Sequence, residues 1–292
     1  MNLLPIKKGI VLAGGTGSRL WPLTKIHSKQ LLPVFDKPLI YYPIATLMSF
    51  GIRDLFVITA ERDLNSFKEL LWDGSQWGVN IQYGTQKTPD GIPKALQIAQ
   101  SFLANEPCAL ILGDNVFHAN WDNIYSQALV DCKNSAHIVC SRVNNPAAFG
   151  VLEANQKGEL INILEKPANP PSNWAVTGLY FYPPDACEKS LSLTPSKRGE
   201  TEITDLNVSY IKGKRLQHHC LDPSNSWFDT GTPESLLAAA NYVSKTQSAK
   251  RILIGSPEIT AFTNDWISCT QLQNLVSKIP PTAYATALKA FL

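Results

Sequence analysis

The 292-residue sequence lacks a strong excess of charge and lacks any long uninterrupted apolar run. Its 26 Lys and Arg residues nearly balance 24 Asp and Glu residues, and the formal net charge is +2. So small an excess, without a local run of like charges, argues against nucleic acid or an acidic membrane as the partner. No stretch approaches the roughly 20 apolar residues of a membrane-spanning helix, and residues 1–8 lack the apolar core of a signal peptide. We therefore expect a cytoplasmic protein with no membrane partner.

The six cysteines also lack a functional pattern. They form no C-x-x-C pair and no zinc spacing, which favours reduced structural thiols over disulfides or metal ligands. His218 and His219 are adjacent in an expected strand, so their side chains would point to opposite faces. We interpret these two histidines as incidental rather than as a metal pair.

What the sequence does contain is a glycine-dense turn directly after a buried-strand pattern, within residues 10–20. Glycines let consecutive backbone N–H groups approach a phosphate closely, and Arg19 would add charge-assisted donors. The turn is neither a Walker A loop, which needs Lys after its last Gly, nor a Rossmann fingerprint, because Leu20 stands where the third Gly is required. Lys29 and Gln30 follow closely, which favours a triphosphate site over a turn that binds nothing.

The glycine turn belongs to an ordered set of segments that resembles the glucose-1-phosphate thymidylyltransferases, which are sugar-phosphate nucleotidyltransferases. The segments are residues 12–20, 28–33, 36–43, 73–78, 112–117, 176–182, 198–205 and 228–232. The resemblance covers residues 8–292 and implies Mg²⁺-dependent transfer of a nucleotidyl group from dTTP to α-D-glucose 1-phosphate. The products would be pyrophosphate and dTDP-glucose, a precursor for deoxysugars and polysaccharides. The family also implies a homotetramer.

The pattern of apolar residues predicts a Rossmann-like, doubly wound, mostly parallel α/β sheet. Strands are expected at 54–59, 79–83 and 108–112, and helices at 63–72, 94–104 and from the N-cap Asp36 to Gly51. Asp114 follows the strand at 108–112, so it should emerge on the same side of the sheet as the glycine turn.

From residue 147 the pattern changes to a β-rich half with a helical tail. We expect strands at 149–154, 160–164, 174–182 and 215–221, a helix at 198–212, and a helix from Pro233 with Thr232 as its N-cap. We predict one nucleotidyltransferase domain at 1–250, with a nucleotide half at about 8–146 and a sugar-side half at about 147–250. Residues 251–292 would form a C-terminal helical extension, whose apolar side chains fit either a subunit contact or an intramolecular cap.

The resemblance, residue by residue, implies four catalytic residues: Arg19, Lys29, Asp114 and Asp229. Arg19 would stabilise the departing pyrophosphate, and Lys29 the triphosphate or its transition state. Asp114 and Asp229 would bind Mg²⁺, which proteins normally hold with one or two carboxylates together with phosphate oxygens and water. Viewed alone, each aspartate matches an ordinary turn or strand-end residue, and only their joint occurrence supports the metal assignment.

The resemblance also implies two sets of binding residues. The nucleotide contacts are Leu12, Gly14, Gly15, Thr16, Gly17, Gln30, Gln86 and Gly91. The sugar-phosphate contacts are Asn115, Gly150, Glu165, Lys166, Val176 and Thr177. Without the motif, Glu165 and Lys166 would match a surface salt bridge of little energetic value.

Several residues depart from the family pattern, namely Trp21, Pro93, Lys94, His118 and Phe149. Because the phosphate and metal residues are retained, these departures concern the choice of base and sugar rather than the reaction type. Two alternatives stay open: the same chemistry with UTP or an amino-sugar 1-phosphate, and a nucleotide-binding regulator without turnover. Release of pyrophosphate from dTTP and a sugar phosphate would exclude the regulator.

Overall fold

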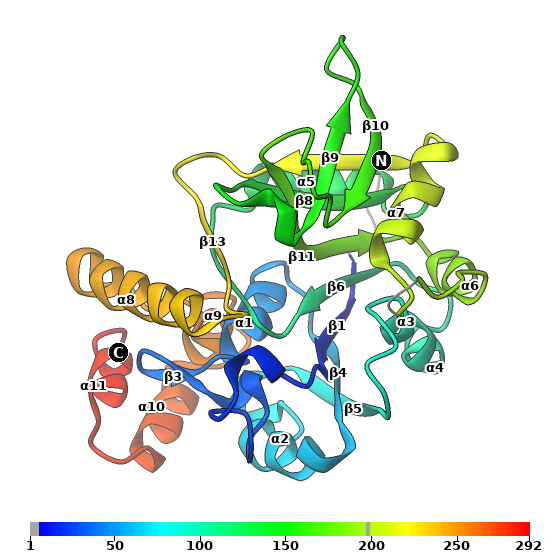
Figure 1. Ribbon diagram of the computed structural model, residues 1–292. Coiled ribbons are helices and arrows are strands. Elements are labelled where there is room, and N and C mark those ends of the chain that lie inside the picture. The colour runs from blue at the N-terminus through cyan, green and yellow to red at the C-terminus, as the bar shows by residue number, and fades with distance from the viewer. Residues whose placement is uncertain (1–5, 197–198) are drawn as a thin grey trace.

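Strand β1 (Lys8–Ala13) lies inside a sheet that has nine strands in the described part of the chain, residues 6–196 and 199–292 of a computed structural model (Figure 1). Strands β4 (Asp54–Ala60) and β6 (Cys108–Leu112) pair with β1 on its two sides, and β5 (Asn80–Gln86) pairs with β4. All three pairings are parallel. The apolar runs of β1, β4 and β6 are almost completely buried, as expected of strands covered on both faces, whereas β5 is only partly buried. The predicted mostly parallel α/β sheet is confirmed.

The sheet changes direction at β11 (Trp174–Tyr182), which runs antiparallel to β6. The β-rich half consists of β8 (Ala136–Arg142), β9 (Gly150–Ala154), β10 (Leu160–Glu165) and β12 (Leu216–Cys220). Strands β8 and β9 pair antiparallel with β11, β10 pairs antiparallel with β9, and β12 runs parallel to β8. The predicted β-rich half therefore continues the same sheet.

Helices cover both faces of the sheet. One face carries α1 (Tyr41–Ser49), α2 (Leu64–Leu71) and α5 (Asp122–Asp131), and the other carries α3 (Lys94–Ile98), α4 (Gln100–Leu103), α6 (Ala186–Leu191) and α7 (Ile203–Lys212). Successive residues of β1 face opposite layers: Val11 packs in the first core and Ile10 in the second. Among the described residues, no helix combines the length and the apolar character that crossing a bilayer requires.

The start of α1 corrects the sequence prediction. Asp36 is not an N-cap, because α1 begins only at Tyr41 and Lys37–Pro38 forms strand β3, paired with β2 (Pro33–Val34). The Asp36 carboxylate instead accepts hydrogen bonds from Lys37 Nζ at 2.5 Å and from Gln247 Nε2 at 2.9 Å. Because Gln247 is 211 residues from Asp36, the sequence near Asp36 gives no indication of this contact.

Two other predicted helices are too long. The helix expected at 94–104 is divided at Ala99, whose ψ of 3° lies outside the helical range, into α3 and α4. The helix expected at 198–212 begins only at Ile203, and residue 198 lies outside the described residues.

The C-terminal extension packs on the same chain. Helix α8 (Pro233–Lys250) begins as predicted, with the Thr232 side chain accepting a hydrogen bond from the backbone N–H of Ser235. It is followed by α9 (Pro257–Thr263), α10 (Cys269–Lys278) and α11 (Ala283–Lys289). Ile267 and Leu272 are buried in the core that contains α1. The intramolecular cap is thus observed, whereas the homotetramer remains a prediction.

Strands β8 and β12 bring two histidines together that the sequence did not link. The rings of His137 and His219 stack with centroids 5.3 Å apart, and His137 Nδ1 lies 3.0 Å from His219 Nε2. His218, next in sequence, is exposed on the opposite face, as predicted. Burial, and secondarily the charge of His219, lower the pKa of His137 to about 4, and burial also lowers the pKa of His219.

This pair predicts a pH-dependent stability. His137 binds a proton more weakly in the folded than in the unfolded protein. The neutral side chain therefore makes its full contribution to the unfolding free energy above about pH 6.5, and this contribution is lost as the pH falls to about 4. We expect the unfolding free energy of the wild type to fall by about 3 kcal/mol more than that of His137→Gln across this window. Urea titrations at several pH values measure this, with the exposed His27→Gln as control. An equally steep decline in the His137→Gln protein would contradict the assignment.

Candidate active site

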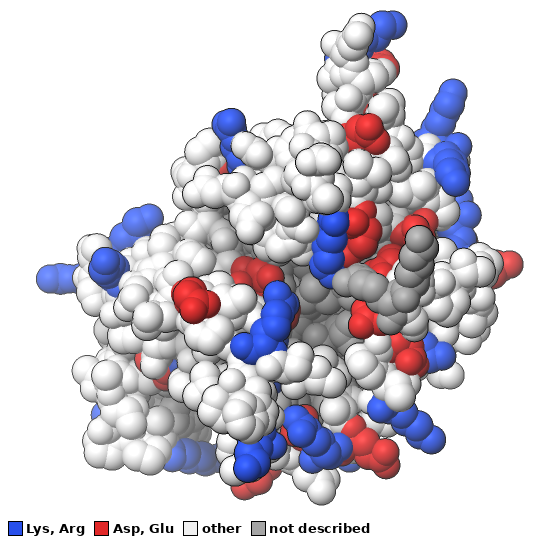
Figure 2. Space-filling model, in the orientation of Figure 1, with Lys and Arg blue, Asp and Glu red and all other residues white. Residues whose placement is uncertain are grey.

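A cleft of about 340 Å³ lies where β1 and β6 end and is lined by both halves of the chain. The predicted residues that line it are Leu12, Gly14, Gly15, Thr16, Gly17, Arg19, Lys29, Gln30, Gln86, Gly91, Asp114, Glu165 and Lys166. The space-filling view shows basic and acidic side chains gathered around a hollow in the middle of this face (Figure 2). The structure therefore brings together every predicted nucleotide residue with two of the predicted sugar-phosphate residues.

The glycine turn is shaped by a backbone conformation that only glycine adopts easily. Gly17 has φ of +62°, and a Cβ at this position would lie 2.8 Å from Thr24 Cγ2. Thr24 Oγ1 also donates a hydrogen bond of 2.8 Å to the Gly17 carbonyl, which fixes the turn. Gly15 and Thr16 are exposed at its tip. Such a turn presents backbone N–H groups to an anion in the cleft.

Asp114 is held as a carboxylate at the end of β6. It forms an ion pair with Lys29, and Asn115 Nδ2 donates to its Oδ1 at 2.9 Å. The side chains of Lys29 and Asp114 are only 8% and 19% exposed. Burial alone would raise the pKa of Asp114, but the adjacent Lys29 ammonium, with the hydrogen bonds from Lys29 and Asn115, holds this pKa below its usual range. Asp114 is therefore negatively charged at neutral pH.

Asp229 is placed next to Asp114 by a short two-stranded antiparallel sheet. Strand β13 (Ser226–Asp229) pairs antiparallel with β7 (Asn115–His118), which places Asp229 opposite Asn115 and beside Asp114. Thr230 Oγ1 donates a hydrogen bond of 2.8 Å to the Asp114 carbonyl and locks this arrangement. Burial, followed by the charge of Asp114, raises the pKa of Asp229.

Gly231 lets the guanidinium of Arg19 approach the carboxylates. A Cβ on Gly231 would lie 2.7 Å from Arg19 Nη2 and 3.1 Å from Asp229 Oδ1. All four residues predicted to be catalytic therefore lie close together: Arg19, Lys29 and Asp114 line the cleft, and Asp229 lies directly beside them.

The two aspartates supply oxygen atoms of the kind that Mg²⁺ prefers. Among the described residues, no group of three or more His, Cys, Asp or Glu side chains could hold a metal ion. The carboxylate pair therefore fits a Mg²⁺ that takes its other ligands from phosphate oxygens and water, rather than a metal held by protein atoms alone.

The other predicted sugar-phosphate residues lie behind the cleft surface. Asn115 is 2% exposed, and its Oδ1 accepts hydrogen bonds from the Gly178 N–H at 3.0 Å and from Trp227 Nε1 at 2.6 Å. Val176 and Thr177 are buried in β11. Gly150 lies beside Glu165, since a Cβ there would be 3.7 Å from Glu165 Oε2. Sugar contacts by these four residues remain predictions.

Sequence reasoning missed several residues that line the cleft: Pro89, Ile92, Leu112, Glu200, Glu202 and Ile203. Three of them fall in residues 198–205, a segment that carries the family resemblance and could have revealed them. Here the backbone N–H and Oγ1 of Thr201 donate to the Asp90 carbonyl at 2.9 and 2.8 Å. This tie joins the loop after β5 to the segment before α7.

The departures from the family pattern are absent from the residues that line the cleft. Pro93 is buried at the start of α3, and Lys94 Nζ donates to Gln97 Oε1 at 3.0 Å. His118 Nδ1 lies 2.7 Å from the Tyr242 hydroxyl, and Phe149 packs edge-to-face on Trp227. Trp21 is 66% exposed. None of these five side chains therefore belongs to the described lining of the cleft.

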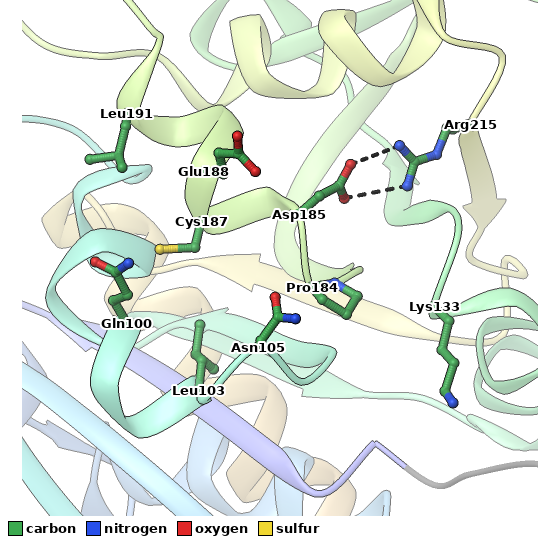
Figure 3. A pocket seen from close by; sticks show the side chains of 10 residues that line it. All are labelled: Gln100, Leu103, Asn105, Lys133, Pro184, Asp185, Cys187, Glu188, Leu191 and Arg215. Carbon is green, nitrogen blue, oxygen red and sulfur yellow. Dashed lines mark hydrogen bonds and ion pairs between the residues drawn. The ribbon is translucent and has the colours of Figure 1, made fainter.

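A larger hollow, of about 560 Å³, lies near α4, α6 and the start of β12 (Figure 3). It contains no predicted site residue. Its Asp185 and Arg215 already neutralise each other through hydrogen bonds of 2.7 and 3.3 Å. The convergence of charged groups, rather than cavity size, therefore identifies the candidate site.

The chain is similar along most of its length to known proteins. A family model described as nucleotidyl transferase matches residues 8–246. Glucose-1-phosphate thymidylyltransferases from Xanthomonas campestris pv. campestris (strain B100) and Neisseria meningitidis serogroup A are each 44% identical to the chain over 284 residues. The Xanthomonas match covers 97% of this chain and 96% of the Xanthomonas protein. The Neisseria match covers 96% of this chain and 98% of the Neisseria protein.

Solved structures show the same fold. A Bacillus anthracis protein described as a glucose-1-phosphate thymidylyltransferase, in complex with sucrose, superposes with a TM-score of 0.75 and 37% identity, covering 80% of this chain and 94% of its own. A UDP-glucose pyrophosphorylase complexed with UDP-glucose gives a TM-score of 0.73 at 26% identity, covering 82% and 99% of the two chains.

The contacts of Asn115 predict a structural cost for its removal. Asn115→Ala would leave the Gly178 and Trp227 N–H groups without their acceptor and would remove one of the donors to Asp114, at a cost of about 3 kcal/mol in unfolding free energy. Urea denaturation at neutral pH measures this, with the exposed Asn144→Ala as a matched control. Equal stability of the two variants would show that the network contributes nothing.

Proposed function

Because this chain belongs to the nucleotidyl transferase family, and within it to the glucose-1-phosphate thymidylyltransferases, we propose that it joins dTTP and α-D-glucose 1-phosphate to give dTDP-glucose and pyrophosphate. The main support is the meeting of the glycine turn, two cations and two carboxylates at one end of the cleft. A transfer between two phosphate compounds needs this combination, since the barrier consists mostly of charge repulsion and positioning.

In the proposed reaction, a phosphate oxygen of the sugar 1-phosphate attacks the α-phosphorus of dTTP in line with the departing pyrophosphate. The backbone N–H groups of the glycine turn bind the triphosphate, and Arg19 donates to the leaving pyrophosphate. Lys29, which pairs with Asp114, lies where a triphosphate would compete for its ammonium group. Asp114 and Asp229 would hold Mg²⁺, which supplies Lewis-acid neutralisation of phosphate charge when bound.

Glu165 and Lys166 are suited to the sugar phosphate. Glu165 accepts a hydrogen bond of 2.5 Å from Thr204 Oγ1, which holds its carboxylate beside the cleft, where it can accept from sugar hydroxyls. The Lys166 side chain is 45% exposed and lies 3.3 Å from Glu165. Its backbone has φ of +44°, a conformation that bulky residues rarely adopt and that is typical of ligand-binding positions. Lys166 would pair with the incoming phosphate.

Two buried amides, Gln30 and Gln86, are suited to the nucleobase. Ser28 Oγ donates a hydrogen bond of 2.6 Å to Gln30 Oε1, so the Gln30 amide N–H groups are available to the carbonyl oxygens of a pyrimidine. Thymine and uracil share these carbonyls, so hydrogen bonding alone does not separate dTTP from UTP. The choice between them depends on the methyl group and the 2′ position.

A pyrophosphate-release assay with Mg²⁺ tests the proposal. Crossing dTTP, UTP, CTP, ATP and GTP against glucose 1-phosphate and N-acetylglucosamine 1-phosphate should give the highest kcat/KM for dTTP with glucose 1-phosphate. An optimum with UTP or the amino sugar would favour the same chemistry on other substrates. No pyrophosphate from any pair would reject the enzyme and support a nucleotide-binding regulator.

Removing the charge of Asp114 should abolish turnover while leaving the fold intact. Asp114→Asn keeps the shape of the side chain but removes a proposed Mg²⁺ ligand and the partner of Lys29, so kcat should fall by about a thousandfold or more. Initial rates over a range of Mg²⁺ concentrations, with circular dichroism as the check on folding, measure this. The exposed Asp265→Asn should keep wild-type rates. Near-normal rates for Asp114→Asn in excess Mg²⁺ would refute the assignment.

A further inference from the structure

A second groove, of about 370 Å³, lies where α10 and α11 meet strand β3 and the end of α2. Its walls are largely apolar: Tyr41, Leu70, Trp72, Trp77, Leu275, Ile279 and Tyr284. It shares no lining residue with the active-site cleft. The ring of Tyr41 packs edge-to-face on Trp77, with centroids 5.4 Å apart.

Trp72 lines this groove and has an unusual exposure and backbone conformation. Its side chain is 67% exposed, and its φ of +51° is rare for a bulky residue. Its carbonyl accepts a hydrogen bond from the Tyr83 hydroxyl, which holds the backbone there. The fold thus maintains an exposed aromatic ring beside an apolar groove at a conformational cost.

The polar atoms left without partners in the groove are acceptors. Glu258 is 6% exposed, and its Oε2 accepts hydrogen bonds from the Tyr284 hydroxyl at 2.6 Å and from Ser256 Oγ at 3.0 Å, while Oε1 has no partner among the described residues. Gln76 Nε2 donates to the Leu71 carbonyl at 2.9 Å, which fixes the orientation of the amide. Its Oε1 is buried without a hydrogen-bond partner in the described part of the chain.

The lysines that line the groove do not satisfy these acceptors. Lys37 Nζ is already bound to Asp36 at 2.5 Å, to the Ile254 carbonyl at 3.1 Å and to Gln247 Oε1 at 3.3 Å. Two carboxylates, Asp36 and Glu258, therefore line the groove beside a buried lysine whose Nζ is already bound. Lys278 is exposed at the rim, where solvent screens its charge.

We propose that this groove binds an amphipathic organic cation, an ammonium group attached to a planar aromatic body, of the arylalkylamine class. The ammonium would donate to Glu258 Oε1, the open acceptor of the groove, and would place a cation beside this buried carboxylate. The aromatic body would pack between Trp72 and Tyr41, and the ring faces of the groove favour a cation nearby. A neutral or anionic aromatic compound would leave Glu258 Oε1 unpaired and is expected to bind poorly.

Isothermal titration calorimetry with tryptamine tests the proposal on the full chain without nucleotide, so the result is independent of the activity proposed above. We expect a dissociation constant of about 0.1 mM, in keeping with a ligand of this size. Indole-3-propionate has the same ring and the opposite charge, and it should bind at least about tenfold more weakly. The proposal would be overturned if tryptamine did not bind at 10 mM, which is the result expected if a second copy of the chain covers the groove. Equal affinity for the two compounds would also overturn it.

Two variants locate the site. Glu258→Gln retains an acceptor for Tyr284 but removes the charge, and it should weaken tryptamine binding about tenfold or more. Trp72→Ala removes an exposed ring that makes no core contact and should weaken binding about threefold. The exposed Glu234→Gln on α8 is the matched charge control and should bind as the wild type does. Unchanged affinity in both Glu258→Gln and Trp72→Ala would place any binding elsewhere and refute the site.

Discussion

The cleft depends on holding two carboxylates close together in a largely buried place. Asp114 keeps its charge because Lys29 offsets the cost of burial, whereas burial and the charge of Asp114 raise the pKa of Asp229. Cations close to the pair relieve this repulsion, and Arg19 and Lys29 do so only in part. A site in this electrostatic state gains from binding a further cation, as the proposed Mg²⁺ would be, arriving with phosphate oxygens.

The register of the strands sets the position of that pair. Asn115 is the junction, because its side chain accepts from Gly178 in β11 and from Trp227 in β13 while donating to Asp114 at the end of β6. The β7–β13 ladder is needed to place Asp229 opposite Asn115. The change of direction at β11 therefore shapes the candidate active site, since the antiparallel half supplies the contacts that orient a carboxylate belonging to the parallel half.

The parallel half could be predicted from the sequence because β1, β4 and β6 are short apolar runs and the glycine turn is a typical phosphate-binding element. The family resemblance located most of the charged residues that line the cleft, but not Glu200 and Glu202. It could not show that Thr177 is buried and donates to the Val139 carbonyl, because orientation depends on the neighbouring strand. The predicted N-cap role of Asp36 was wrong for a related reason. The prediction used a local pattern, whereas the hydrogen-bond partner Gln247 lies 211 residues further along the chain. Local periodicity carries no information on such contacts.

The buried Lys37 explains why the C-terminal extension and the sheet form one unit. Its ammonium is bound by Asp36, by Gln247 of α8 and by the Ile254 carbonyl, and it lies 5.3 Å from the centre of the Tyr284 ring. Without the extension, part of this shell would be missing around a buried charge, which is strongly destabilising. The hairpin that carries Lys37 is joined to the cleft, since the Ile40 N–H donates to the Gln30 carbonyl at 2.9 Å. This short segment thus contacts Gln30, which lines the candidate active-site cleft, and its residues Lys37 and Pro38 line the second groove.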